Sequence, residues 1–281
     1  MADDTILTLQ DVVAGYGRMT ILNGLSAAIR RAKITTVIGP NGAGKSTLFK
    51  TVFGLLGVRS GKVTFDGHDT TSLSPRRMLD AGMCYVPQGR NLFPELSVRH
   101  NLELGGVALS DQSRLGARVD AMMDRFPMLR EKADAQASTL SGGQQKLLEV
   151  ARGLLLDPKL VLIDEPSIGL SPLMVEEVFA ILKGLRDSGV TILLIEQNAR
   201  QALAISDYGL VLEQGQARIA DTAAAILARV RAADADRSAV DIGSEPMTEA
   251  GLGHFPVLRH LALLELMIII IEILWIGTNI L

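Results

Sequence analysis

GPNGAGKST, residues 39–47, matches the pattern G-x-x-x-x-G-K-[ST] of a loop that binds phosphate groups. Residues 34–38 (ITTVI) before it read as a strand, and residues 45–56 after it read as a helix. The glycines let backbone N–H groups approach phosphate oxygens, and the helix N-terminus adds the positive end of its dipole. The alternative is a chance glycine-rich turn, but a strand before and a helix after are what a phosphate loop requires. The stretch therefore predicts a nucleoside triphosphate site.

Two side chains in this loop have predicted roles of their own. The ammonium of Lys45 suits the β- and γ-phosphates, which makes it a candidate catalytic group, and the hydroxyl of Ser46 suits Mg²⁺. The predicted nucleotide ligands are all the residues of the loop, through backbone or side chain: Gly39, Pro40, Asn41, Gly42, Ala43, Gly44, Lys45, Ser46 and Thr47.

A pair of carboxylates follows a second apolar run, in LVLIDEP at residues 160–166. This run predicts a buried strand with Asp164 and Glu165 at its carboxyl end, where open α/β sheets build their sites. Asp164 suits the Mg²⁺ side of the nucleotide, and Glu165 is a candidate base for the attacking water. A solvated turn is the alternative for the pair alone. A chain that also carries a phosphate loop favours the site over the solvated turn.

The rest of the chain alternates strand and helix patterns, which predicts an α/β layered fold. Between about 74 and 153 the pattern is mainly helical, interrupted by Pro87, Pro94 and Pro127. The other predicted elements are strands at 6–13, 61–66 and 190–195, a hairpin turn at Asp66-Gly67, a helix at 172–187, a hairpin at 209–219 and an alanine-rich helix at 222–233.

Composition narrows the class of protein. The chain has 281 residues, 48% of them apolar and 21% charged, which fits a globular chain with a large core. A net charge of −3 gives no sign of a general nucleic-acid binder, so no nucleic-acid partner is expected. Cys84 stands alone, which excludes an intrachain disulfide. The first ten residues lack the basic and apolar regions of a secretory signal, so a cytosolic protein is expected.

A further segment, LSGGQQ at residues 140–145, is not required by phosphate-loop chemistry. Taken alone it reads as a serine helix cap. Together with the loop and the acidic pair, in this order and spacing, it resembles the signature motif of ATP-binding-cassette ATPases, and the resemblance covers roughly residues 5–235. It implies a P-loop NTPase with a RecA-like core, an antiparallel β edge and a helical subdomain near 88–153. Residues 1–235 would form the nucleotide-binding domain, followed by a linker at 236–256.

The resemblance assigns further site residues by implication. Tyr16 resembles the aromatic residue that stacks on adenine, and Gln88 the glutamine that senses Mg²⁺ and the γ-phosphate beside the membrane subunits. The alternatives are a turn tyrosine and a plain loop amide. The signature residues would hold the γ-phosphate of ATP bound to an opposite subunit, so that two chains enclose two ATP molecules; they are Ser141, Gly142, Gly143 and Gln144.

Two positions depart from the usual pattern of the family. Gln197 stands where a histidine usually acts as a γ-phosphate switch, and Ser171 stands where an aspartate is usual. Both departures resemble those of the branch that takes up branched-chain amino acids. Importers of urea or amides share such features, and a soluble cassette ATPase outside transport is a more distant alternative.

Membership of this branch implies a set of partners and a location. The partners are two membrane-spanning permease subunits, a second ATPase subunit (a copy or a paralogue) and an external solute-binding protein. The chain would lie at the cytoplasmic face of the inner membrane as a peripheral subunit.

The last 25 residues are an apolar addition that the resemblance does not cover. Within 261–276 only Glu265 and Glu272 are polar, and their spacing of seven puts them on one stripe of a helix. Such carboxylates oppose a lone membrane span. Three interpretations stay open for residues 257–281: a docking helix, a membrane anchor, or an end without function.

Overall fold

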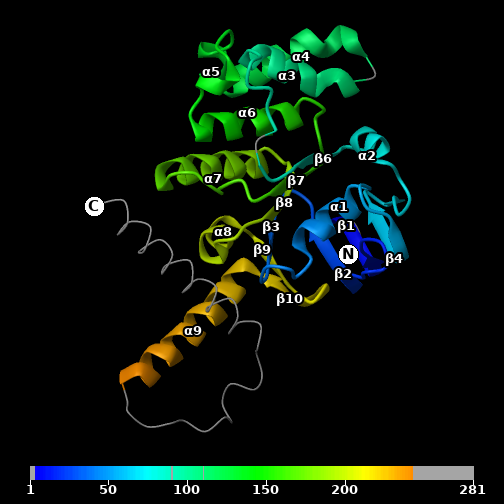
Figure 1. The fold of residues 1–281 in the computed structure, drawn as a ribbon, viewed down its shortest axis with the longest axis vertical. Coiled ribbons are helices and arrows are strands. Elements are labelled where there is room, and N and C mark those ends of the chain that lie inside the picture. The colour runs from blue at the N-terminus through cyan, green and yellow to red at the C-terminus, as the bar shows by residue number, and fades with distance from the viewer. Residues whose placement is uncertain (1–3, 90, 110, 243–281) are drawn as a thin grey trace.

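The structure is a computed structural model, and it describes residues 4–89, 91–109 and 111–242. Two sheets form its framework (Figure 1), an antiparallel one in the order β2-β1-β4-β5 and a larger one in the order β10-β9-β3-β8-β7-β6. The strands are β1 (Thr5–Ala14), β2 (Leu22–Arg30), β3 (Ile34–Ile38), β4 (Val58–Phe65), β5 (His68–Asp69), β6 (Met83–Val86), β7 (Leu160–Asp164), β8 (Thr191–Ile195), β9 (Tyr208–Glu213) and β10 (Gln216–Thr222).

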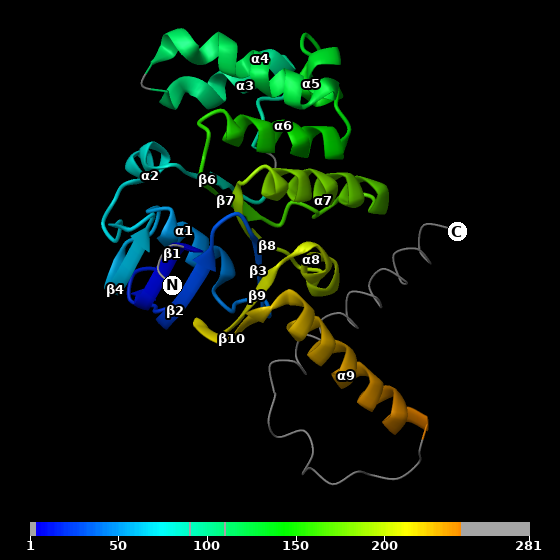
Figure 2. The same ribbon diagram turned by 180° about the vertical axis from the view of Figure 1, so that it is seen from behind.

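The helices fall into separate groups along the molecule. Figures 1 and 2 show α3, α4, α5 and α6 gathered at one end beyond α7, while α9 extends at the opposite end. The helices are α1 (Lys45–Val52), α2 (Pro75–Ala81), α3 (Val98–Gly105), α4 (Leu115–Arg125), α5 (Pro127–Glu131), α6 (Gly142–Leu154), α7 (Pro172–Asp187), α8 (Ala199–Ile205) and α9 (Ala223–Ile242). Helices α3 to α6, from Val98 to Leu154, thus form a layer of their own.

The core of the larger sheet consists of three short strands, each buried along its whole length. β3, β7 and β8 have five residues each, and all are buried. They pair in parallel, and only β10 at the far edge runs antiparallel to its neighbour β9. Continuous apolar runs are typical of parallel strands covered on both faces. The predicted α/β core with an antiparallel edge is confirmed.

The sequence patterns missed two strands. β6 lies inside the stretch predicted to be mainly helical, because four residues between Gly82 and Pro87 are too few to show a period. It pairs in parallel with β7 at the edge of the sheet. β2 (LNGLSAAIR) is poor in β-branched residues and is formed by pairing with β1.

Both predicted hairpins are present. Asp66 and Gly67 have φ values of 50° and 79° in the turn between β4 and β5, and Gln214 and Gly215 have 50° and 74° in the turn between β9 and β10. Two adjacent residues with positive φ are what a tight hairpin turn demands.

At the carboxyl end of the described chain, one boundary was predicted wrongly. α9 runs through Ile242, so the linker predicted from 236 begins as helix. The remainder of that linker and the apolar tail at 257–281 lie outside the described residues. In the described part of the chain, no helix is both long and apolar enough to cross a membrane.

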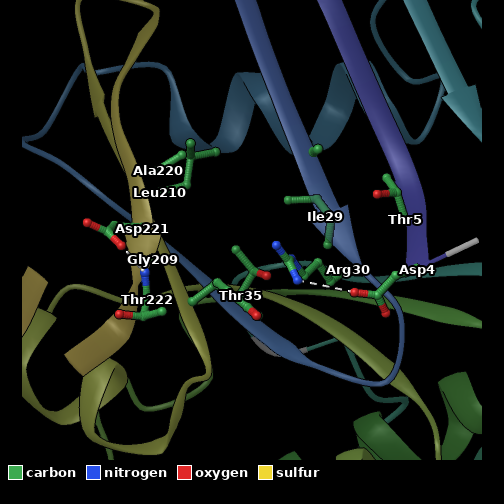
Figure 3. A pocket seen from close by; sticks show the side chains of 12 residues that line it. Asp4, Thr5, Ile29, Arg30, Thr35, Gly209, Leu210, Ala220, Asp221 and Thr222 are labelled. Atoms are coloured by element: carbon green, nitrogen blue, oxygen red, sulfur yellow. Dashed lines mark hydrogen bonds and ion pairs between the residues drawn. The ribbon is translucent and has the colours of Figure 1, made fainter. Parts of the chain in front are cut away.

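A groove of about 700 Å³ opens between the two sheets, at the end of β3 that lies away from the phosphate loop (Figure 3). Its charged groups are already partnered. Arg30 pairs with Asp4 at 3.3 Å and lies over the ring of Tyr208 at 4.9 Å, and Asp221 pairs with Arg229 at 3.1 Å. Because these groups satisfy one another, the groove offers little charge to a ligand.

Gly215 links the two sheets to the phosphate loop. Its N–H donates to the carbonyl of Ala43 at 3.0 Å, and its carbonyl accepts from the N–H of Asn23 at 3.0 Å. A Cβ atom here would lie 1.7 Å from the backbone oxygen of Ile21. The hairpin tip therefore needs glycine both for its φ and for the close approach of backbone.

We expect Gly215→Ala to destabilise the fold by at least about 1 kcal/mol, because the left-handed φ and the clash act together. A chain of this size should then lose roughly 2–4 °C or more in Tm, measurable by calorimetry. Gly184→Ala is the matched control, because that glycine lies in α7 with open space around its Cβ position. Helix propensity predicts an unchanged or higher Tm for the control. Equal Tm values for the two variants would contradict the anchoring role of Gly215.

Candidate nucleotide site

The phosphate loop joins the end of β3 to the start of α1, as the sequence predicted. Lys45, the first residue of α1, folds its side chain back over the loop. Its Nζ donates to the carbonyls of Gly39 at 2.8 Å and Pro40 at 3.2 Å. Burial lowers the pKa of Lys45, while the charges of Glu165 and Asp164 oppose that shift. The ammonium thus stabilises the conformation of the loop, and its buried position strengthens its attraction for an anion.

A pocket of about 240 Å³ opens over this loop. Glu165, from the end of β7, faces residues that are more than a hundred positions earlier in the chain. The lining residues are Ile21, Asn41, Gly42, Gly44, Lys45, Ser46, Thr47 and Glu165. Six of the nine predicted loop ligands therefore share one pocket with the predicted base, while Gly39, Pro40 and Ala43 are not part of its lining.

Asp164 ends β7 and is buried, with 3% of its surface exposed. Its Oδ2 accepts from the hydroxyl of Tyr85 at 3.2 Å, but its Oδ1 is buried and has no hydrogen-bond partner among the described residues. Burial raises the pKa of Asp164, and the hydroxyls of Tyr85 and Ser46 together with the ammonium of Lys45 oppose the shift. A buried carboxylate oxygen without a donor, next to a serine hydroxyl, fits the oxygen ligands that Mg²⁺ prefers.

Glu165 is half-buried, and its backbone has a φ of 47°, in the left-handed region. Its N–H donates to the carbonyl of Ile195 at 2.9 Å, which holds this conformation against the end of β8. The Nε2 of Gln88 donates to Oε2 of Glu165 at 2.7 Å. Burial first, and the charge of Asp164 second, raise the pKa of Glu165, while Lys45 opposes the shift. A raised pKa in a carboxylate beside phosphate ligands is typical of a general base.

The signature residues lie elsewhere. Ser141 caps α6, where its Oγ accepts from the N–H of Gln144 at 3.3 Å and the Gln144 side chain accepts from the N–H of Ser141 at 3.1 Å. A Cβ on Gly142 would lie 2.9 Å from Leu170, and one on Gly143 would lie 3.2 Å from Met174. The helix cap read from sequence is therefore present, and both glycines allow α6 to approach the start of α7. None of these residues lines the phosphate pocket of the same chain.

Tyr16 and Gln197 were also predicted at the site, and both are exposed. Tyr16 lies beside α1, with the Lys50 ammonium 6.0 Å from its ring centroid. Gln197 follows β8, and its backbone N–H donates to the carboxylate of Glu196 at 3.2 Å. The cap of α8 is Asn198, whose Oδ1 accepts from the N–H of Gln201 at 3.1 Å, so capping that helix does not explain Gln197.

Sequence reasoning missed two polar groups at the site, Tyr85 and Glu196. Tyr85 lies on the unpredicted strand β6, and burial raises its pKa, with the charge of Asp164 adding to the shift. Glu196 directly follows the apolar run of β8, as Asp164 and Glu165 end the run of β7. That shared position at a strand end is the signal that could have found Glu196.

Comparison with known proteins decides the family. A family model described as "ABC transporter" matches residues 22–168. The chain belongs to the ABC transporter family. It is 38% identical over 230 residues to the high-affinity branched-chain amino acid transport ATP-binding protein BraG of Pseudomonas aeruginosa, covering 82% of this chain and 98% of that protein. It is 41% identical over 215 residues to the probable branched-chain amino acid transport ATP-binding protein LivF of Archaeoglobus fulgidus, covering 76% and 91%.

Solved structures agree with the ABC assignment. The crystal structure of the ADP conformation of MJ1267, an ATP-binding cassette of an ABC transporter, superposes with a TM-score of 0.74 at 28% identity and covers 85% of this chain and 99% of that chain. A nucleotide-free ATP-binding cassette from an ABC transporter gives a TM-score of 0.71 at 28% identity, covering 78% and 91%. The chain is thus an ATP-binding subunit with the ABC cassette fold, and its family implies ATP hydrolysis.

Lys45→Ala should lower affinity for ATP by at least about tenfold, because the phosphate charge loses a buried ammonium. Isothermal titration with a non-hydrolysable ATP analogue measures this directly. Lys183→Ala, an exposed lysine on α7, is the control and should bind as the wild type does. Unchanged affinity in Lys45→Ala would show that ATP binds somewhere else.

Proposed function

We propose that this chain powers the uptake of branched-chain amino acids, as the ATP-hydrolysing subunit of an ABC importer. The observation that carries the proposal is its similarity, over 98% and 91% of their lengths, to two proteins named for branched-chain amino acid transport. In this function, ATP hydrolysis on the cassette drives a conformational change in membrane-spanning permease subunits, and an external binding protein delivers the solute.

In this proposal, each site residue has its own role in hydrolysis. Lys45 neutralises the β- and γ-phosphates, and the loop N–H groups cradle them. Glu165 accepts a proton from the attacking water, helped by its raised pKa. Gln88 donates a hydrogen bond to Glu165 at 2.7 Å, so it orients that carboxylate, and it senses the γ-phosphate. Tyr16 stacks on the adenine.

Ser46, Gln88 and Asp164 would hold Mg²⁺. The fit rests on the unpartnered Oδ1 of Asp164 and on the hydroxyl of Ser46 beside it. The ion would neutralise charge on the phosphates as the terminal bond breaks. In the described part of the chain no cluster of three or more acidic, histidine or cysteine groups forms a separate metal site, so the ion would come with the nucleotide.

Two surfaces of the chain are candidates for contact with the partners of this function. A groove of about 300 Å³ runs between β6, α3 and α6, with Leu104 and Val107 in its lining. These two apolar side chains are 39% and 68% exposed. A permease segment that buries them would lie beside Pro87, the residue before Gln88, and would in this way couple docking to the site. Ser141, Gly142 and Gly143 would bind ATP held by a second ATPase subunit, and the chain would lie at the cytoplasmic face of the inner membrane.

Lipopolysaccharide export is a second candidate function, and one similarity supports it. The chain is 31% identical over 212 residues, 74% of this chain, to the lipopolysaccharide export system ATP-binding protein LptB of Escherichia coli. Uptake of urea or amides is a third possibility for the same cassette, and a soluble ATPase outside transport is the most remote.

Purification of the native complex separates these functions. We expect its partner chains to include two permease subunits and a binding protein, and vesicles that contain the complex should accumulate labelled leucine when ATP is supplied. Accumulation of urea or acetamide instead would move the assignment to a related importer. Partners that include no permease would overturn the transport function.

Glu165→Gln should keep ATP binding but lower turnover by on the order of a hundredfold, the usual scale for a lost general base. The amide still accepts from Gln88, so the loop should keep its shape. Phosphate release and size-exclusion chromatography with ATP test this, and we expect a trapped dimer. Phosphate release within about threefold of the wild type would remove Glu165 from the base role.

Gln197→Ala should lower the hydrolysis rate by about threefold to tenfold, with ATP affinity changed much less, because one neutral hydrogen bond to the γ-phosphate is lost. Gln197→His should be tolerated, since imidazole can donate from the same place, and its rate should gain a pH dependence near the imidazole pKa. Phosphate release at several pH values tests both variants. A wild-type rate in Gln197→Ala would leave this exposed amide without a catalytic part.

A further inference from the structure

Glu196 is an acidic side chain inside the protein that neither the family motifs nor the roles above use. It follows β8 and precedes Gln197, and only 2% of its surface is exposed. Burying a carboxylate is costly unless its oxygens accept hydrogen bonds. The hydrogen bonds that Glu196 accepts therefore indicate the role of this buried carboxylate.

Both oxygens of Glu196 reach the loop that follows Glu165. Oε1 accepts from the N–H of Ser167 at 3.0 Å, and Oε2 accepts from the Ser167 hydroxyl at 2.7 Å. Oε2 also accepts from the N–H of Gln197 at 3.2 Å. All three contacts use Glu196 as an acceptor, which is the role of an ionised carboxylate. Burial raises the pKa of Glu196, and the donors from Ser167 are the first to oppose this shift.

The backbone of Glu165 needs such support. A non-glycine residue with a φ of 47° occupies a conformation that costs about 1–2 kcal/mol and persists only where its surroundings fix it. The N–H of Glu165 donates to the carbonyl of Ile195, and two residues later Ser167 is held by Glu196. The turn from Glu165 to Ser167 is thus attached at both its ends to the end of β8.

We propose that Glu196 is a positioning residue for hydrolysis, which clamps the turn carrying Glu165 to the loop carrying Gln197 through Ser167. The clamp sets the carboxylate of Glu165 and the amide of Gln197 at fixed places around the terminal phosphate. Glu196 acts from outside the phosphate pocket, because it is not among the residues that line that pocket. Displacement of a reacting group by about 1 Å can cost up to a hundredfold in rate, so losing the clamp should act on turnover.

Three variants of the full chain test the clamp through phosphate release over a range of ATP concentrations. Glu196→Ala should lower kcat by about tenfold or more and leave KM for ATP within about twofold. Glu196→Gln should recover kcat to within about threefold of the wild type, because the amide oxygen still accepts one N–H and the Ser167 hydroxyl can turn to accept from the amide. Ser167→Ala, which removes only the hydroxyl contact, should lower kcat by about threefold.

Asp207→Ala is the matched control. Its carboxylate also accepts a backbone N–H, that of Ile34 at 2.9 Å, and pairs with Lys33 at 3.7 Å, but at the opposite end of β3. It should lower Tm without lowering kcat by more than about twofold. A kcat within twofold of the wild type in Glu196→Ala would overturn the proposal, as would an equal loss of kcat in the control. If Glu196→Ala does not fold, Ser167→Ala decides, and a wild-type kcat there overturns the clamp.

The proposal rests on the proposed role of Glu165, and the same assay keeps the two apart. Turnover lost in Glu165→Gln but kept in Glu196→Ala would overturn the clamp alone. Turnover kept in Glu165→Gln would overturn the base, and a loss in Glu196→Ala would then have to act through Gln197.

Discussion

The parallel register of β3, β8 and β7 is the constraint on which the site depends. Val37 lies opposite Ile195, and Ile195 lies opposite Asp164, so the three strands end on one line across the sheet. The phosphate loop starts two residues past Val37, Glu165 follows Asp164, and Glu196 follows Ile195. A slip of one residue would turn each of these side chains to the other face of the sheet. These strands are buried along their whole length and most of their side chains are apolar, so packing in the core opposes such a slip and sets the geometry of the chemistry.

A buried ion pair on α6 connects the helical subdomain to the loop that carries Gln88. Lys146 and Glu149, on α6, are 8% and 4% exposed, and Nζ lies 2.5 Å from Oε2. The other oxygen of Glu149 accepts from the N–H of Asn91 at 2.7 Å, and Lys146 also donates to the carbonyl of Gly89 at 3.3 Å. Removing one partner of such a pair leaves an uncompensated buried charge and commonly costs about 3–5 kcal/mol. The loop that carries Gln88 is therefore tied to α6, and the two should move together when either is displaced.

Much of the fold and the site could be predicted because the decisive signals are local. ITTVI matched β3, and the acidic pair lies at the strand end where its apolar run placed it. What escaped prediction depends on pairing partners distant in sequence. β6 has four residues and exists because β7 lies beside it, and Tyr85 was lost with it. Glu196 reads as one more polar residue after a strand, and only the fold brings it to Ser167, 29 positions earlier.

The size of the pocket bears on how many chains make a site. About 240 Å³ lies below the roughly 300–1,000 Å³ of typical ligand pockets, and its lining comes almost entirely from one loop. A nucleotide bound there would leave much of its surface uncovered. The first N–H groups of a helix have no partner within the helix, and Ser141 and Gly142, at the start of α6, are only half-buried. Such an end is suited to phosphate. The start of α6 does not line the phosphate pocket of its own chain. A phosphate bound there would therefore belong to ATP held in the loop of a second copy. The same contact would cover the open side of that nucleotide. In such a pair, each chain would supply what the other lacks, which would be a physical basis for the two-subunit ATPase proposed above.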